Sequence, residues 1–330
     1  MKTLPNTLPF APDKPWLAPL AGWSDLPFRL LCRQFGAAVC CTEMISAKGL
    51  IYKSPGTAEL FATCPKDEPV VVQVFGSEAP FMEAATEQLR AKGFRWFDCN
   101  MGCSVPKVAR TGSGAAMCKD IDNALAVAEA LIRAAGRGNV GFKLRLGWDE
   151  HTIAETWRIL APALEELGAG WLTLHPRTAK QGFTGAARWE ALGELKALVS
   201  VPVIASGDLF TAEDGVRCLQ ETGVDTVMYA RGALRDPAIF KAHLDLLAGR
   251  EPVVADVPTL LSRIREHARL AHDLSSEKVA LLKMRTIVPR YIRHIEGSRQ
   301  LRADIIACRS WDEFEKALQA FEARTEAVSA

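Results

Sequence analysis

The segment FDCNMGCSVPKVARTGSGAAM, from Phe97 to Met117, holds the cysteine with the most unusual surroundings. A short apolar run leads into Asn100 and then Cys103, and a loop rich in glycine, serine and basic residues follows. Cysteine is among the most often buried residues, but Cys103 stands between Gly102 and Ser104. These neighbours predict a displayed thiol at the mouth of a strand. The alternative, a small hydrophobic side chain in the core, is disfavoured by them.

Polar side chains also close several other apolar runs, where a plain core would not have them. By strand alternation, Lys143 and Arg145 share one face, and Phe142 and Leu144 share the other. Taken singly, each such group is more often a satisfied polar residue than a ligand-binding one. Together they predict a binding site, because unpaired charge in a buried mouth is costly unless something binds there. The set comprises Gln73, Asn100, Lys143, Arg145, His175, Arg177, Ser206, Asp208 and Arg231.

The spacing of β-rich and helical segments predicts how these groups are positioned. Eight β-rich runs occupy 16–22, 39–46, 70–76, 96–102, 140–147, 171–178, 202–208 and 225–232. Helical periodicity fills the segments between several of them, at 79–93, 122–136, 152–168 and 211–223, each closing on a glycine. Eight strand–helix units favour a (β/α)8 TIM barrel, in which the active site lies at the carboxyl ends of the strands.

The end of the chain reads differently, because β-rich runs stop near residue 250. Helical segments are expected at 258–273, 276–295, 298–308 and 311–324, after a linker near Gly249 to Pro258. We therefore expect a barrel domain over 1–250, followed by a small C-terminal helical bundle over 251–330.

The last two strands of the barrel suggest a phosphate site. In SGDLFTAED a glycine is followed by Thr211, a candidate helix N-cap, and YARGALRDP ends the eighth strand at Arg231 and Gly232. Barrels often hold a phosphate in the loops after strands seven and eight. By contrast, the G-x-G-x-x-G at Gly136, Gly138 and Gly141 ends a helix and enters a strand, the reverse of a dinucleotide-binding motif, and is discarded.

Composition excludes several other classes of protein. The 330 residues are 48% hydrophobic and 24% charged, with nine cysteines and no C-x-x-C spacing. This pattern argues against a disulfide framework, a zinc site and an iron–sulfur centre, so no metal is expected. The N-terminal residues lack the apolar core of a signal peptide, and no run of about eighteen apolar residues offers a membrane span. We expect a cytoplasmic protein that makes no membrane contact.

The net charge of +1 conceals a basic segment. Residues 258–302 hold ten Lys and Arg against four Asp and Glu. A solvated helical face and a surface for a polyanion such as RNA both explain this excess, and on the residues alone the solvated face is favoured.

Taken together, the motifs resemble the dihydrouridine synthases, flavoenzymes that reduce uridine in RNA. The tail segment KMRTIVPRYIRHIEG is similar to the RNA-binding helical domain of the bacterial members, especially the B-type enzymes. The resemblance covers nearly the whole chain. It rests on APLAGWSDLPFR (18–29), TEM (42–44), VQVFGS (72–77), DCNMGCSVPKV (98–108), KLRLGW (143–148), LHPRT (174–178), VPVIASGD (201–208) and MYARGAL (228–234).

The resemblance implies an activity, a cofactor and residue roles. Uridine would be reduced at its C5–C6 bond, with a hydride from reduced FMN and a proton from Cys103, and NADPH or NADH would reduce the flavin. Asn100, Arg145 and Arg177 would hold the uracil, and Lys107 the RNA backbone. The partner would be RNA, with tRNA favoured over rRNA, and the protein a monomer; which uridine is reduced stays open. FMN would be bound by Pro19, Leu20, Ala21, Gln73, Lys143, His175, Ser206, Gly207, Asp208, Ala230 and Arg231.

Three positions depart from the family pattern, which usually has Pro at Ser104, Asn at Ser206 and Gly at Ala230. A serine hydroxyl still offers a hydrogen bond and Ala230 still offers its backbone N–H, so FMN binding is expected to persist. Ser104 is expected to loosen the loop that holds the cysteine.

Two other functions remain open. One is an FMN barrel acting on a free pyrimidine or enone, as dihydroorotate dehydrogenase does, which leaves the basic tail without a purpose. The other is a non-catalytic RNA-binding protein, which the intact Cys103, Lys143 and His175 disfavour.

Overall fold

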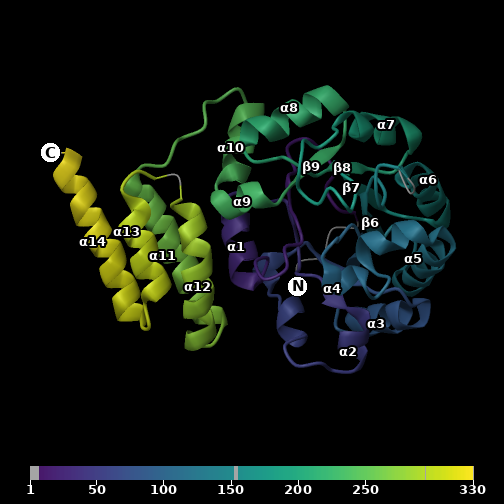
Figure 1. Cartoon of the computed structure of the whole chain (residues 1–330), viewed down its shortest axis with the longest axis horizontal. Helices are drawn as coiled ribbons and strands as arrows, with labels where there is room; N and C mark the ends of the chain where they lie inside the picture. The colour runs from purple at the N-terminus through teal and green to yellow at the C-terminus, as the bar shows by residue number, and fades with distance from the viewer. Residues whose placement is uncertain (1–6, 152–154, 294, 330) are drawn as a thin grey trace.

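The computed structural model describes residues 7–151, 155–293 and 295–329, and its centre is a closed barrel of eight parallel strands (Figure 1). The predictions that fall on residues 1–6, on 152–154 at the start of a helical segment, and on His294 lie outside the described residues. The predicted TIM barrel is confirmed. Its strands are β1 (Trp16–Leu17), β2 (Val39–Cys41), β4 (Val70–Phe75), β5 (Trp96–Met101), β6 (Val140–Arg145), β7 (Trp171–His175), β8 (Val203–Ala205) and β9 (Thr226–Tyr229).

Strand β1 closes the barrel by pairing with both β2 and β9, while β2 pairs with β4. The predicted run 39–46 is broken at residues 42–44, and its end forms the separate short strand β3 (Ile45–Ser46) beside β4. The first predicted strand is also shorter than expected, since residues 18–25 after β1 form a loop over the barrel mouth.

Helices surround the barrel and begin at identifiable caps. Thr211 is the N-cap of α8, as predicted, and forms a capping box with Asp214. Gly168 and Gly223 end α6 and α8 in left-handed conformations that suit glycine. The helices are α1 (Leu26–Gln34), α2 (Ala47–Ile51), α3 (Ala79–Ala91), α4 (Pro106–Ala109), α5 (Ile121–Ala135), α6 (Trp157–Leu167), α7 (Glu190–Leu198), α8 (Ala212–Thr222), α9 (Arg231–Arg235) and α10 (Ile239–Leu247).

Aromatic side chains fill the inside of the barrel at the amino ends of the strands. The ring of Trp16 lies 5.3 Å from that of Phe10 and 5.7 Å from that of Trp171. A Cβ on Gly141 would lie 2.0 Å from the Trp171 indole, so this position requires glycine for packing. Gly141 therefore makes room for a core side chain, which agrees with discarding the G-x-G-x-x-G motif. This packing fills the amino end of the barrel.

The basic tail folds as four helices, α11 (Val257–Leu274), α12 (Glu277–Tyr291), α13 (Ser298–Ala307) and α14 (Trp311–Ser329), which match the predicted segments. They stand in a row beside α1, after a connection that crosses from α10 (Figure 1). Their buried side chains belong to the same apolar core as the layer between barrel and helices. None of the helices in the described part of the chain is both long and apolar enough to cross a membrane.

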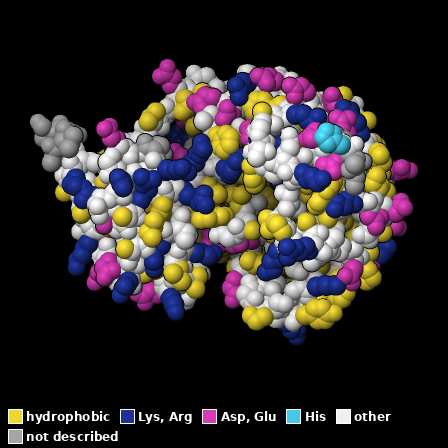
Figure 2. Space-filling view, viewed as in Figure 1, with side chains coloured by type: hydrophobic (Ala, Val, Ile, Leu, Met, Phe, Trp, Pro, Cys, Tyr) yellow, Lys and Arg dark blue, Asp and Glu magenta, His cyan; other side chains and the backbone are white. Residues whose placement is uncertain are grey.

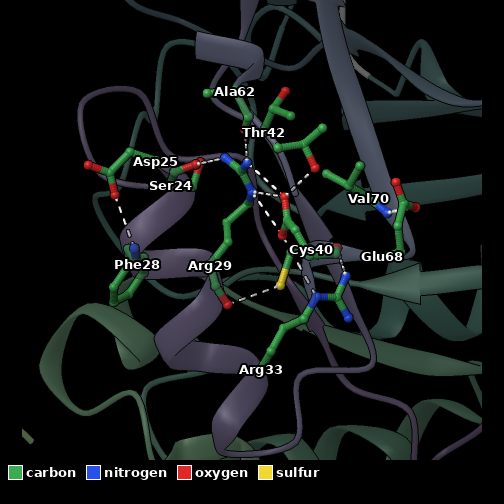
Figure 3. Close-up of polar contacts among 12 residues, drawn as sticks. Ser24, Asp25, Phe28, Arg29, Arg33, Cys40, Thr42, Ala62, Glu68 and Val70 are labelled. Atoms are coloured by element: carbon green, nitrogen blue, oxygen red, sulfur yellow. Dashed lines mark hydrogen bonds and ion pairs between the residues drawn. The ribbon is translucent and has the colours of Figure 1, made fainter. Parts of the chain in front are cut away.

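Helix α1 is fixed to the turn of residues 65–67, just before β4, by a buried ion pair, and Figure 3 shows the contacts of Arg29. The guanidinium of Arg29 has no exposed surface and donates to both carboxylate oxygens of Asp67. Its other N–H groups donate to the carbonyls of Ser24 and Ala62. All three guanidinium nitrogens therefore have acceptors, which is the condition for burying a charge.

The tail contacts the barrel through charged and aromatic groups as well as apolar ones. Lys283 of α12 donates to Asp25, the N-cap of α1, and its ammonium lies 4.0 Å from Glu43. The Arg290 guanidinium lies 4.3 Å from the ring centre of Trp23. Both contacts reach the loop and helix that follow β1.

His267 lies in the interface between α1 and the tail. Its Nδ1 is 2.9 Å from the Tyr291 hydroxyl, its ring packs against Phe28 of α1, and burial lowers its pKa to about 4. An unfolded histidine has a pKa near 6.5. The stability that the protein gains by holding His267 neutral is therefore complete above pH 6.5 and is lost as the pH falls toward 4.

We predict that His267→Gln removes most of the fall in the free energy of unfolding that acid causes. Between pH 7 and pH 4 the free energy of unfolding of the parent protein should fall by about 3 kcal/mol more than that of the variant. Urea unfolding at a series of pH values measures the difference. His272→Gln on the same helix, whose side chain is 56% exposed, is the control and should leave the pH dependence unchanged. Parallel curves for the parent and His267→Gln would contradict the assignment.

Candidate active site

A pocket opens at the carboxyl ends of the strands and brings together all but two of the predicted site residues. The two that are not in its lining are Arg177 and Lys107. Sequence reasoning missed the apolar walls, including Met44 and Phe183, although Met44 lies within a quoted motif. The predicted residues in the lining are Pro19, Leu20, Ala21, Gln73, Asn100, Cys103, Lys143, Arg145, His175, Ser206, Gly207, Asp208, Ala230 and Arg231.

The turn that carries Cys103 follows β5 and is held from several sides. Asn100 Oδ1 accepts from the backbone N–H groups of Gly102 and Cys103, at 3.1 and 2.8 Å. Arg145 Nε donates to the Gly102 carbonyl at 2.7 Å, and the Ala115 N–H donates to the Cys103 carbonyl at 2.9 Å. Cys103 is half-buried, so the thiol is displayed at the pocket wall rather than enclosed in the core.

Two ionisable groups lie inside the barrel below this turn. Asp98 of β5 is buried, and burial raises the pKa of its carboxyl to about 7, although a hydrogen bond from Gln73 and the Lys143 charge act to lower it. Burial likewise lowers the pKa of the Lys143 ammonium, against the attraction of Asp98. Lys143 makes no hydrogen bond or ion pair with any described residue. Its ammonium is therefore available to a ligand in the pocket.

Arg145 and His175 add polar groups to the same wall. Two Arg145 nitrogens donate to the carbonyls of Gly102, Thr178 and Gly182, and burial lowers its pKa to about 10. The pKa of His175 is lowered well below its ordinary value by burial and then by the charge of Lys143. His175 is therefore a neutral imidazole at physiological pH.

Arg177 does not reach the pocket because its donors are used within the protein. Its guanidinium pairs with both carboxylate oxygens of Asp208, at 2.8 and 2.7 Å, and donates to the carbonyls of Thr184 and Gly185. Burial opposes ionisation of Asp208, but hydrogen bonds from Arg177 and the Ala187 N–H outweigh it and lower its pKa. Lys107 lies in the exposed helix α4, outside the lining.

The loops after β8 and β9 form one end of the pocket. The Gly207 carbonyl accepts from Trp189 Nε1 at 3.0 Å, and a Cβ on Gly232 would lie 2.7 Å from the Leu209 carbonyl, so the two loops are in close contact. The Arg231 guanidinium stands here over the rings of Phe183 and Phe210, 3.3 Å from Asp208. Half-exposed and cationic, it can receive an anion.

Among the described residues, no group of three or more His, Cys, Asp and Glu side chains is arranged to hold a metal ion. The polar groups of the pocket include amides, hydroxyls, an imidazole and one thiol, and its three cations outnumber the single carboxylate, that of Asp208, a set suited to an anionic organic ligand.

Comparison with known proteins adds the family. Residues 16–328 match the family model described as dihydrouridine synthase (Dus). A probable tRNA-dihydrouridine synthase 1 of Synechocystis sp. is 33% identical, over 90% of this chain and 82% of its own length. The tRNA-dihydrouridine synthase B of Pseudomonas aeruginosa is 31% identical, over 91% of this chain and 88% of its own.

Solved structures agree in fold. A variant of NCR from Zymomonas mobilis aligns with a TM-score of 0.53 and 16% identity, over 78% of this chain and 94% of its own. Morphinone reductase aligns with a TM-score of 0.53 and 12% identity, over 74% and 88%. At these identities the likeness concerns the barrel alone.

The Arg177–Asp208 pair yields a stability prediction. Asp208→Asn should lower the free energy of unfolding by about 3 kcal/mol, because it leaves a buried guanidinium without its carboxylate. Asparagine tolerates the positive φ of 55° at this position, so the backbone should be unchanged. Glu194→Gln, which breaks the exposed pair with Arg158, is the control and should cost less than about 1 kcal/mol. Equal losses in urea unfolding would show that burial of Arg177 is not the cause.

Proposed function

The chain belongs to the dihydrouridine synthase family, and we propose that it reduces the C5–C6 double bond of a uridine in tRNA to dihydrouridine. One observation carries the proposal: Cys103, Lys143, Arg145, His175 and Arg231 all line one pocket at the open end of the barrel. A thiol, a cluster of cations and a neutral imidazole meet there. The names of the relatives point to tRNA as the substrate.

The pocket fits FMN. Apolar walls from Leu20, Met44 and Met228 suit a flat ring, and the half-buried Lys143 ammonium lacks a protein partner among the described residues. At the other end, Arg231 and the 206–208 turn can hold a phosphate. When bound and reduced, FMN supplies the hydride for C6 of the uracil. Lys143 would stabilise negative charge on the reduced ring.

The other FMN contacts carry over from the predicted set. Pro19, Leu20 and Ala21 would pack against the ring, with Gln73 and His175 beside its polar edge. Ser206, which stands where the family usually has Asn, is buried in the lining and keeps a hydroxyl there. Ala230 contributes through its backbone, so its side chain does not interfere.

Cys103 would give the proton to C5 of the uracil. The nitrogen of Arg145 that makes no backbone contact can approach a uracil carbonyl, whereas Arg177 would act by fixing Asp208. Asn100 reaches the substrate only through the part of its amide that the turn leaves free. NADPH or NADH would reduce the flavin.

A basic groove on the tail supports RNA binding. Arg290, Arg293, Arg299 and Arg302 line it between α12 and α13, and none forms an ion pair with a described residue. Figure 2 shows Lys and Arg side chains gathered around the hollow between the tail and the barrel. Unlike these four, Lys283 is paired with Asp25 and is not free for phosphate.

These features support separate roles for the two parts of the chain, catalysis in the barrel and RNA binding in the tail. Residues 1–250 would form the catalytic barrel and residues 251–330 the RNA-binding domain, with Lys107 in an exposed loop helix near the pocket gripping the backbone. The target base must leave its stack to reach the barrel mouth.

We propose a monomer that acts in the cytoplasm, where tRNA is modified. Mapping dihydrouridine in tRNA from a deletion strain and its parent tests the activity itself.

Cys103→Ala tests the proton donor. The variant should keep its flavin and the reduction of that flavin by NADPH, because the pocket walls are intact. Formation of dihydrouridine should fall by a factor on the order of 100 to 10,000, as expected for loss of a general acid. Liquid chromatography of digested tRNA measures the product. Cys64→Ala, at another partly exposed cysteine, should leave the yield unchanged. A near-parental yield from Cys103→Ala would remove Cys103 from this role.

The basic groove is tested by replacing Arg293, Arg299 and Arg302 with Gln. Each lost phosphate contact should reduce the slope of log affinity against log salt by about 0.7 to 0.9. Flavin content should not change. The matched control replaces Arg309, Lys316 and Arg324 of the same tail with Gln, which removes the same charge outside the groove. If both triple variants lose affinity equally, the groove has no special part in binding.

A further inference from the structure

Three buried side chains inside the barrel form a hydrogen-bond chain that ends on the Cys103 turn. Gln73 Nε2 donates to Asp98 Oδ2 at 2.6 Å, and Asn100 Nδ2 donates to Gln73 Oε1 at 2.9 Å. Asn100 Oδ1 then accepts from the backbone N–H groups of Gly102 and Cys103. The chain joins β4 to β5, and all three side chains are at least nine-tenths buried.

Both ends of this hydrogen-bond chain require the same orientation of the two amide side chains, with each nitrogen pointing toward Asp98 and each oxygen toward the Cys103 turn. Backbone N–H groups only donate, so Asn100 must present its oxygen to them and its nitrogen to Gln73. Gln73 must in turn present its oxygen to Asn100 and its nitrogen to the third residue. Asp98 Oδ2 accepts from Gln73 Nε2, and Asp98 therefore completes the chain with a single orientation for both amides.

The second oxygen of Asp98 is buried without a hydrogen-bond partner, in the field of the Lys143 charge. A carboxyl group in this place is costly, and its geometry shows one direct use, the bond from Gln73. We propose that Asp98 is a positioning residue that sets the direction of the Gln73–Asn100 chain and thereby holds the Cys103 turn. The consequence for catalysis rests on the proposed function, whereas the hydrogen-bond chain does not.

Changing both partners gives a specific test. In Asp98→Asn, the new NH2 group must face either the nitrogen of Gln73, which places two donors together, or the position of Oδ1, which is buried and has no hydrogen-bond partner among the described residues, so neither arrangement satisfies the new donor. In Gln73→Glu, two carboxyl groups face each other. The double variant exchanges the two functional groups, so that the amide now at position 98 can donate to the carboxylate now at position 73. That carboxylate can still accept from Asn100, and the original direction returns.

Hydrogen exchange of the full-length protein measures the outcome, with and without bound flavin. Exchange at the Gly102 and Cys103 amides should be about tenfold faster in Asp98→Asn and in Gln73→Glu than in the parent. The double variant should return close to the parental rate. The amide of Phe142, in the neighbouring strand β6, serves as the reference for global stability. A role in stability alone would change the reference amide equally and would give no recovery in the double variant.

Turnover supplies the second measurement. Asp98→Asn should lower kcat by about tenfold or more with little change in KM for tRNA, because Asp98 is buried inside the barrel and does not line the basic groove, so that only the placement of the thiol is altered. Parental exchange at residues 102 and 103 in Asp98→Asn, or a double variant no better than either single one, would overturn the proposal. If exchange follows the expected pattern but Cys103→Ala retains full activity, the positioning chain stands and the proton-donor role fails.

Discussion

Burial of the Arg29 guanidinium is the constraint on which the pocket loop, helix α1 and the tail all depend. A charge with no exposed surface persists only if its donors find acceptors, and removing one partner of such a pair is costly. Asp67 and the carbonyls of Ser24 and Ala62 provide them. Because Ser24 is also hydrogen-bonded to Leu20, fixing Ser24 holds the loop that lines the pocket. The Arg29 guanidinium thus helps to hold the loop of residues 18–25 in place.

The same helix receives the tail. Asp25 caps α1 and pairs with Lys283 of α12, and the adjacent Glu43 accepts from the Gly22 N–H within the pocket loop. One short segment therefore contacts the barrel, the pocket and the tail. The shared apolar core makes this connection rigid, so a molecule held on the tail lies at a defined position relative to the pocket.

Charges at the strand ends divide into two groups by their partners. Arg177 is neutralised by Asp208 and fixes the loop after β7, whereas Lys143 feels the charge of Asp98 but forms no hydrogen bond or ion pair with a described residue. The first arrangement is structural, since all three guanidinium nitrogens of Arg177 donate to Asp208 or to backbone carbonyls. The second leaves a cation open to the pocket, which is what an electron-rich cofactor requires.

The sequence by itself determined the barrel, the four tail helices and most of the polar residues of the pocket lining. Strand and helix periodicity are set by local backbone geometry, and parallel strands in a barrel must bring their carboxyl ends together, so residues such as Gln73, Lys143 and His175 meet without any knowledge of packing. Only the tertiary structure decided which polar groups remain free. Asn100 holds a backbone turn, Arg177 is consumed by Asp208, and Lys283 pairs with a residue 258 positions earlier in the chain. A hydrogen-bond partner depends on the rotamers and approach of distant segments, and periodicity carries no information about these.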